Sequence, residues 1–175
     1  MSRPSSIPIP RPLFIPLFLF AAAISAACGK GKPALKPVPQ AAVVYDDDAG
    51  GVRDSLRLVV RDAAALGSLW RNATRGQSAP LPPPQVDFRR EMVLAVAAGR
   101  MSANDRIRVD SVGVRKEPGA DGKMREVLSV LVLTTQGCRT FATPVFPVQL
   151  VRVPRYEGQV RFVERREQGE GCGRE

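Results

Sequence analysis

The strongest constraint on the fold is a turn signal between two apolar, β-type segments. Asp121-Gly122 lies in "EPGADGK", residues 117–123, and this dipeptide is typical of a tight hairpin turn. Before it, "RIRVDSVGV" (residues 106–114) alternates between apolar and polar residues, with a shift of phase at Asp110-Ser111 that indicates a β-bulge. After it, "EVLSVLVLTT" is a returning strand. An antiparallel hairpin therefore organises this part of the chain.

The remaining pattern indicates a small α+β domain. "SLRLVV" (residues 55–60) alternates as a half-buried strand, and Asp62 can cap a short helix that buries Leu66, Leu69 and Trp70. The run from residue 92 to 98 is apolar throughout and fits a central strand, and "FPVQLVRVP" and "GQVRFVER" form a final pair. We expect about five or six strands and one short N-terminal helix, in a mainly antiparallel sheet or barrel.

The N-terminal residues predict export. Residues 13–27, "LFIPLFLFAAAISAA", are uncharged, follow a segment with two arginines, and are shorter than the roughly 20 residues of a membrane-spanning helix. "SAAC" (residues 25–28) resembles a bacterial lipobox, in which the cysteine, here Cys28, is lipidated. The alternative is ordinary signal cleavage after Ala23 or Ala26, with Cys28 left as a thiol.

Cysteine parity favours lipidation, because it leaves Cys138 and Cys172 as a disulfide candidate in an exported chain. The expected organisation is a signal peptide over 1–27, a lipid anchor and tether over 28–42, the domain over 43–168 and a glycine-rich tail over 169–175. The expected location is the bacterial envelope, at the outer membrane or periplasmic face, held by a lipid anchor.

Composition excludes several chemistries. The 175-residue chain contains no histidine, so Ser–His–Asp and Cys–His catalysis are impossible, and two cysteines without histidine do not form a standard zinc site. Asp46-Asp47-Asp48 lacks the ligand spacing of a calcium loop and is interpreted as a charged cluster. We therefore predict no enzyme activity, no catalytic residues, no metal and no cofactor. The net charge of +9 comes from scattered arginines without interleaved aromatic residues, which argues against nucleic acid.

A family resemblance adds a functional expectation. The stretch from about Trp70 to Val163 resembles the C-terminal domain of the protease complex subunit PrcB family, through "SLWRN", "LPPPQVDFRREMVLAVAAG" and "TPVFPVQLVRVP" in this order. The resemblance implies a non-catalytic accessory or stabilising domain for another envelope protein, such as a protease. The chain departs from the family at residues 102–106, where the family often has a threonine–glycine–glycine–tyrosine-like turn.

The expected function is thus protein–protein contact by a membrane-anchored lipoprotein, with an oligomeric state that the sequence leaves open. We expect the contact surface to be a sheet face or edge flanked by the loops at 100–106 and 117–125. The candidate contact residues are Asp87, Arg100, Ser102, Asn104, Asp105 and Arg106. For Asp87 and Phe88, the structural interpretation is a turn cap and a core residue, and the functional one is a surface pair. The alternative function is a module that binds an anionic envelope ligand, glycolipid or cell-wall phosphate, through the arginine-rich surface.

Overall fold

The computed structural model describes residues 35–39, 41–79, 81–139, 141–169 and Cys172. The predicted signal peptide and Cys28 lie outside these residues. Within the described part of the chain, no helix has the length and apolar character needed to cross a membrane.

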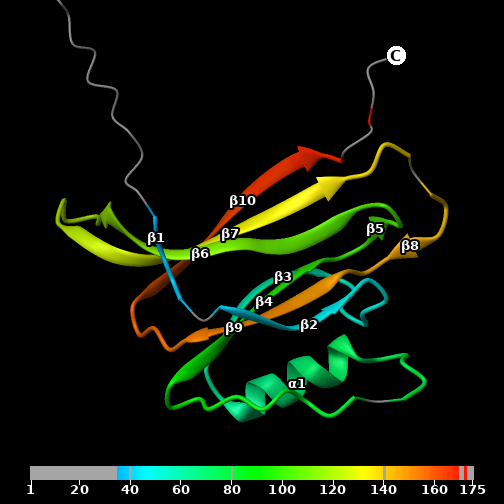
Figure 1. Ribbon diagram of the computed structural model, residues 1–175, viewed down its shortest axis with the longest axis horizontal. Coiled ribbons are helices and arrows are strands. Elements are labelled where there is room, and N and C mark those ends of the chain that lie inside the picture. Colours follow the sequence, from blue (N-terminus) through cyan, green and yellow to red (C-terminus); the bar gives the residue numbers. More distant parts are fainter. Residues whose placement is uncertain (1–34, 40, 80, 140, 170–171, 173–175) are drawn as a thin grey trace, which may run out of the picture. The chain divides into compact units, whose positions relative to one another are not determined.

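Two four-stranded sheets and two short strands make up most of the described chain (Figure 1). The first sheet has the order β1-β6-β7-β10, with bounds Lys36–Pro37, Arg106–Pro118, Met124–Gln136 and Gln159–Gln168. The second has the order β2-β9-β4-β3, with bounds Ala42–Asp47, Val148–Pro154, Glu91–Ala98 and Ser55–Val60. Strands β5 (Met101–Ser102) and β8 (Pro144–Val145) form a separate ribbon. The α+β expectation is confirmed, but the sheets do not close into a barrel.

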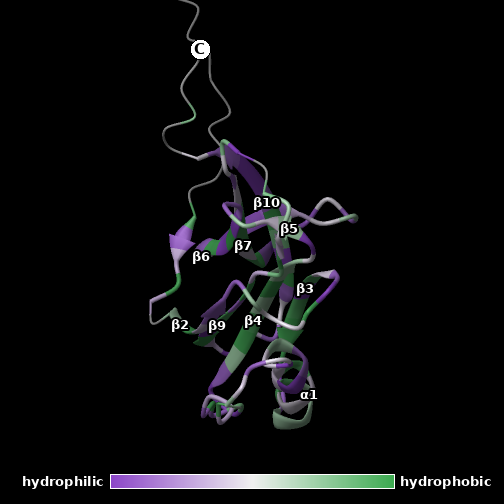
Figure 2. Cartoon of the chain, turned by 90° about the vertical axis from the view of Figure 1, so that its right-hand side faces the viewer, coloured by the Kyte–Doolittle hydropathy of each residue, from purple (hydrophilic) through white to green (hydrophobic). Residues whose placement is uncertain are grey.

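The sheets and the single helix, α1 (Ala63–Ala73), form three layers (Figure 2). Strand β4 lies in the middle layer and is buried on both faces. Met92, Leu94 and Val96 enter the core between the sheets, whereas the alternate residues from Val93 to Ala97 enter the core against α1. Burial on both faces explains why this segment is apolar throughout instead of alternating.

Helix α1 begins where the sequence predicts. Asp62 is its N-cap, and Asp62 Oδ1 accepts a hydrogen bond from the backbone nitrogen of Ala65 at 2.8 Å. Trp70 is only 6% exposed and meets the Tyr45 ring edge-on, with ring centroids 4.8 Å apart. Its indole nitrogen donates to the carbonyl oxygen of Leu81 at 2.8 Å. The prediction that Trp70 is a core residue is confirmed.

The predicted hairpin is also confirmed. Strands β6 and β7 pair in antiparallel register, with the register shift between Val109 and Ser111 where the alternation slips. At the turn, Gly122 has a φ of 73°, a conformation that glycine adopts without steric cost, and the nitrogen of Gly119 donates to the oxygen of Lys123 at 2.8 Å. Turn chemistry and periodicity here specify both the strands and their pairing.

The last two strands differ from expectation, because they do not pair with each other. Strand β9 lies between β2 and β4 in the second sheet, so both of its edges are occupied. Strand β10 joins the first sheet and runs parallel to β7, from Gln159 opposite Val127 to Gln168 opposite Gln136. All other strand pairs among the described residues are antiparallel.

The folded part begins earlier than the predicted boundary at residue 43. Strand β1 pairs with β6, and the nitrogen of Val38 donates to the oxygen of Val112 at 2.9 Å. Gly113 allows this approach: an added Cβ would lie 2.4 Å from Leu35 Cγ. Part of the segment expected to be a free tether, residues 28–42, is therefore built into the first sheet.

Candidate functional site

A hollow with a volume of about 530 Å³ lies at the end of the sheets that carries β5 and β8. Two loops border it, one over residues 99–105 and the other over residues 137–144. Its lining comprises Arg100, Met101, Ser102, Asp105, Gln136, Gly137, Arg139, Phe141, Ala142, Pro144 and Gln168. Three of the predicted contact residues, Arg100, Ser102 and Asp105, are thus brought together here with a second loop that the sequence did not single out.

Asp105 and Ser102 hold the two loops against each other. The carboxylate of Asp105 accepts hydrogen bonds from the backbone nitrogens of Gly137 at 2.9 Å and Ser102 at 3.3 Å. The hydroxyl of Ser102 accepts one from the backbone nitrogen of Phe141, also at 2.9 Å. Since these oxygens bind the protein's own backbone, Asp105 and Ser102 act as supports of the hollow. This assigns them a different role from direct partner contact.

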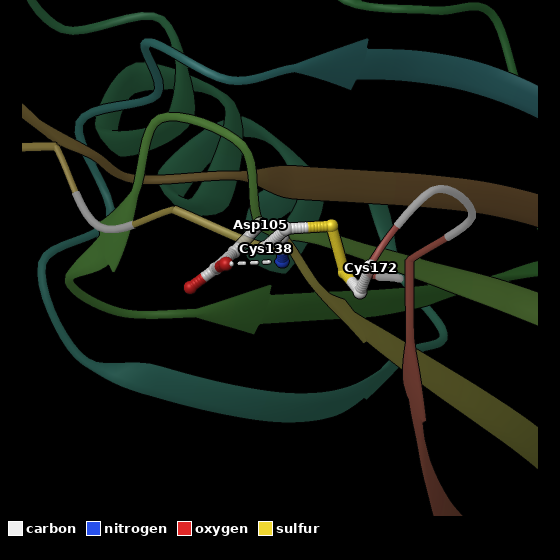
Figure 3. Close-up of a disulfide and its surroundings, with 4 residues drawn as sticks. Asp105, Cys138 and Cys172 are labelled. Carbon is white, nitrogen blue, oxygen red and sulfur yellow. Dashed lines mark hydrogen bonds between the residues drawn. A yellow bond between two sulfur atoms is a disulfide. The ribbon is translucent and has the colours of Figure 1, made fainter. Parts of the chain in front are cut away.

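A disulfide fixes the same wall (Figure 3). Cys138 follows the end of β7 and Cys172 follows the end of β10, and these strands are parallel neighbours. The backbone nitrogen of Gly169 donates to the oxygen of Gln136 at 2.8 Å and extends the pairing toward the bond. The predicted cysteine pair is therefore present in the structure, and it clamps two of the segments that border the hollow.

A second hollow of about 280 Å³ continues the first toward the side edges of the sheets. The two share Arg100, Met101, Asp105 and Gln136 in their linings. The second is completed by Ser55, Arg57, Ala98, Thr134, Glu164 and Arg166. We call the two together the loop groove. It extends from Phe141 at one end to the edge strands β3 and β10 at the other.

The charge of the loop groove is positive. Arg57 is bound to Glu164 by two hydrogen bonds, from Nε at 2.7 Å and Nη2 at 3.0 Å, so this pair is neutral. Arg100, Arg139 and Arg166 are exposed and form no ion pair with another described residue. These three guanidinium groups are left to interact with solvent or with a ligand.

The other predicted contact residues lie outside the loop groove or on its margin. Asn104 is exposed in the same turn but is not part of the lining, and Arg106 pairs instead with Asp48 at 3.3 Å. Asp87 belongs to a distant turn, where its backbone oxygen accepts from the nitrogens of Arg90 and Glu91 at 2.9 and 2.8 Å.

The turn at Asp87 supports its structural interpretation. Its carboxylate accepts a hydrogen bond from the backbone nitrogen of Arg89 at 3.1 Å, and the neighbouring Phe88 packs against the core under α1. Asp87 therefore caps a turn and is not assembled with the residues of the 100–106 loop.

The acidic triplet is divided among separate partners. Asp46 accepts from Gln149 Nε2 at 2.8 Å, Asp47 accepts from the backbone nitrogen of Ala49 at 2.7 Å, and Asp48 pairs with Arg106. Because each carboxylate is already bound by a different group, the charged-cluster interpretation accounts for all three.

Sequence reasoning missed half of the loop groove. Arg139, Phe141, Arg166 and Gln168 come from segments far from residues 100–106 in sequence, and the parallel pairing of β7 with β10 brings them close. Comparisons with known proteins found no family model, no curated protein and no solved structure that matches the chain. The chemistry of the groove is accordingly argued from its own residues.

Proposed function

We propose that this chain is a membrane-anchored, non-catalytic lipoprotein domain of the bacterial envelope that binds another envelope protein through the loop groove. The observation that carries the proposal is the construction of the groove. Two loops distant in sequence are joined by the Asp105 and Ser102 hydrogen bonds and by the Cys138–Cys172 disulfide. A surface that is already ordered loses less conformational entropy when it binds, so fixing these loops favours recognition.

Two further observations support the location and the class of partner. A disulfide is typical of an oxidising, extracytoplasmic compartment, which agrees with the predicted signal peptide and lipidation at Cys28. The resemblance to the PrcB C-terminal domain favours an accessory or stabilising role, with an envelope protease as one partner class. Ser102 and Asp105 line the same hollow, but the hydroxyl of Ser102 and the carboxylate of Asp105 both accept hydrogen bonds from backbone nitrogens. With these groups occupied and no histidine in the chain, we propose binding rather than catalysis.

The alternative function is the binding of glycolipid or cell-wall phosphate by the arginine-rich surface. One observation favours it, namely the three arginines of the loop groove that lack acidic partners among the described residues. Another weakens it, because many surface arginines already have such partners. Ion pairs occupy Arg57, Arg90, Arg106, Arg108, Arg115, Arg125, Arg152, Arg155, Arg161 and Arg165. Arg71, Arg75 and Arg89 also lack an ion pair among the described residues and are exposed outside the groove, so unpaired basic charge is spread over the surface as well.

Site-specific photo-crosslinking in intact cells tests the proposal. A photoreactive amino acid replaces Phe141, which is 46% exposed on the rim of the groove, or Met124, which is 58% exposed at the β6–β7 hairpin and serves as the matched control. We expect one dominant envelope protein to be linked from position 141 and not from position 124. Equal adducts from both positions, or lipid adducts alone from position 141, would contradict binding of a protein in the groove.

A further inference from the structure

The three unpaired arginines of the loop groove point to the chemistry of its ligand. Arg100 follows β4, Arg139 lies in the loop after β7 and Arg166 lies on β10, so they approach the groove from three separate elements. Guanidinium groups present planar donors that match carboxylates in a two-point contact. The side chains of Gln136 and Gln168 add amide groups to the lining of the groove. The groove is therefore rich in hydrogen-bond donors that a ligand with carboxylate groups could satisfy.

The spread of these donors favours an extended ligand over a compact one. Arg139 lines only the hollow of about 530 Å³, Arg166 lines only that of about 280 Å³, and Arg100 lines both. A single phosphate would need these groups to converge on one point, whereas a polypeptide with carboxylates spaced along it can meet them one after another. The exposed ring of Phe141 at one end offers an apolar contact that a peptide side chain can use.

We propose that the loop groove binds an extended protein segment rich in aspartate and glutamate. This inference rests on the proposed function and specifies which chemistry the partner presents to the groove. Asp105 does not oppose such a ligand strongly, because backbone N–H groups bind both of its carboxylate oxygens. Glu164 is neutralised by Arg57. Asp105 keeps its negative charge and offsets one of the three free arginines, Arg100, Arg139 and Arg166, so the lining that the ligand meets has a formal charge of +2.

Fluorescence anisotropy with a labelled peptide tests the inference directly. The probe is a 12-residue peptide of alternating glutamate and serine, and its counterpart carries glutamine at every glutamate position. The full chain, purified in detergent, is titrated against both peptides at low salt and at 0.5 M salt. We expect binding of the glutamate peptide only, with clear weakening at high salt because the screening length falls from about 10 Å at 0.1 M to a few ångströms near 1 M.

Variants then localise the site. An exposed charge contact contributes up to about 1 kcal/mol, so Arg100→Gln, Arg139→Gln or Arg166→Gln should each weaken binding by up to roughly fivefold, and the triple variant by up to about 100-fold. The matched control is Arg71→Gln, on α1, combined with Arg75→Gln, in the turn that follows the helix. Both residues are exposed outside the groove, and the double change should alter affinity less than twofold. An equal loss in the control variant would overturn the inference, because it would show attraction to net charge alone.

Two other results would overturn it as well. One is equal binding of the glutamine peptide, and the other is displacement of the glutamate peptide by inorganic phosphate at an equal concentration of charge. The test also separates this inference from the proposed function. If the position-141 crosslink to an envelope protein persists in the triple glutamine variant while the wild type fails to bind the peptide, the acidic-segment inference fails and the protein-binding function stands. If the peptide binds but no protein is crosslinked, the groove accepts acidic segments and the proposed function of binding an envelope protein fails.

Discussion

Removing the Cys138–Cys172 disulfide should destabilise the domain by an amount that can be worked out from the chain. The two residues are separated by 34 positions. With the loop-closure relation, the bond removes roughly 12.6 cal/mol/K of entropy from the unfolded chain, or about 3.8 kcal/mol at 25 °C. Cys138 is exposed, and the β7–β10 pairing continues without the bond, so the folded state loses little packing. The expected loss of unfolding free energy is therefore close to the full entropic value.

Urea unfolding of the paired variant Cys138→Ser, Cys172→Ser provides the assay. Cys28→Ser is used as the common background, so that no third thiol can exchange with the bond. For a slope of about 1.5 kcal/mol/M, the midpoint should fall by roughly 2.5 M relative to that background. Reducing the parent protein should reproduce the shift, whereas reductant should leave the serine variant unchanged. A loss of less than about 1 kcal/mol would refute the entropic reasoning and show that the unfolded chain is already restricted.

Two further predictions concern the cores and the first sheet. Burial, and secondly the hydrogen bond to Asp47, raises the pKa of Tyr45 from 10.0 to about 12, so stability present below pH 10 should be lost as the pH rises toward 12, by at most about 2.7 kcal/mol. Urea unfolding at pH 9 and 11.5 checks this, and Tyr45→Phe should remove that part of the pH dependence. In Gly113→Ala, the new Cβ would lie 2.4 Å from Leu35 Cγ and 2.5 Å from a backbone oxygen of β1. We expect a loss of about 1–3 kcal/mol by thermal unfolding. Gly67→Ala within α1, where the new Cβ would lie 3.6 Å from Arg71 Nη1, should instead be neutral or slightly stabilising.

The elements that could be predicted are those whose signals are local. The alternation over residues 55–60, the cap at Asp62 and the turn at Asp121-Gly122 each involve residues close together in sequence, and the structure contains all three features. The Cys138–Cys172 pair joins residues far apart in sequence, and it was predictable because the argument needs only the number of cysteines. Two parts of the site were also predictable, namely the 100–106 loop and the cysteine pair that supports its neighbour.

The pairing of strands that are distant in sequence could not be predicted. The alternation in "GQVRFVER" indicates a strand but not its place beside β7 in a parallel register. That pairing brings Arg166 and Gln168 toward Arg100, so half of the groove depends on pairing between strands that are far apart in sequence. Strand β1 was not predictable for a different reason: it consists of two residues, a lysine and a proline, which are too few to show a periodicity.

The early start of the domain changes what lipidation at Cys28 implies for the partner. With a free tether up to residue 43, 43 − 28 = 15 residue steps could extend to about 50 Å at roughly 3.3–3.6 Å each. The first described residue of the folded part is Leu35, so the steps number 35 − 28 = 7, and the reach is about 25 Å at most. A domain whose first folded residue is tethered this closely to the bilayer favours a partner attached to the same membrane, because attachment of both raises their effective concentration. The acidic segment that we infer should accordingly belong to a protein anchored nearby rather than to one that diffuses freely.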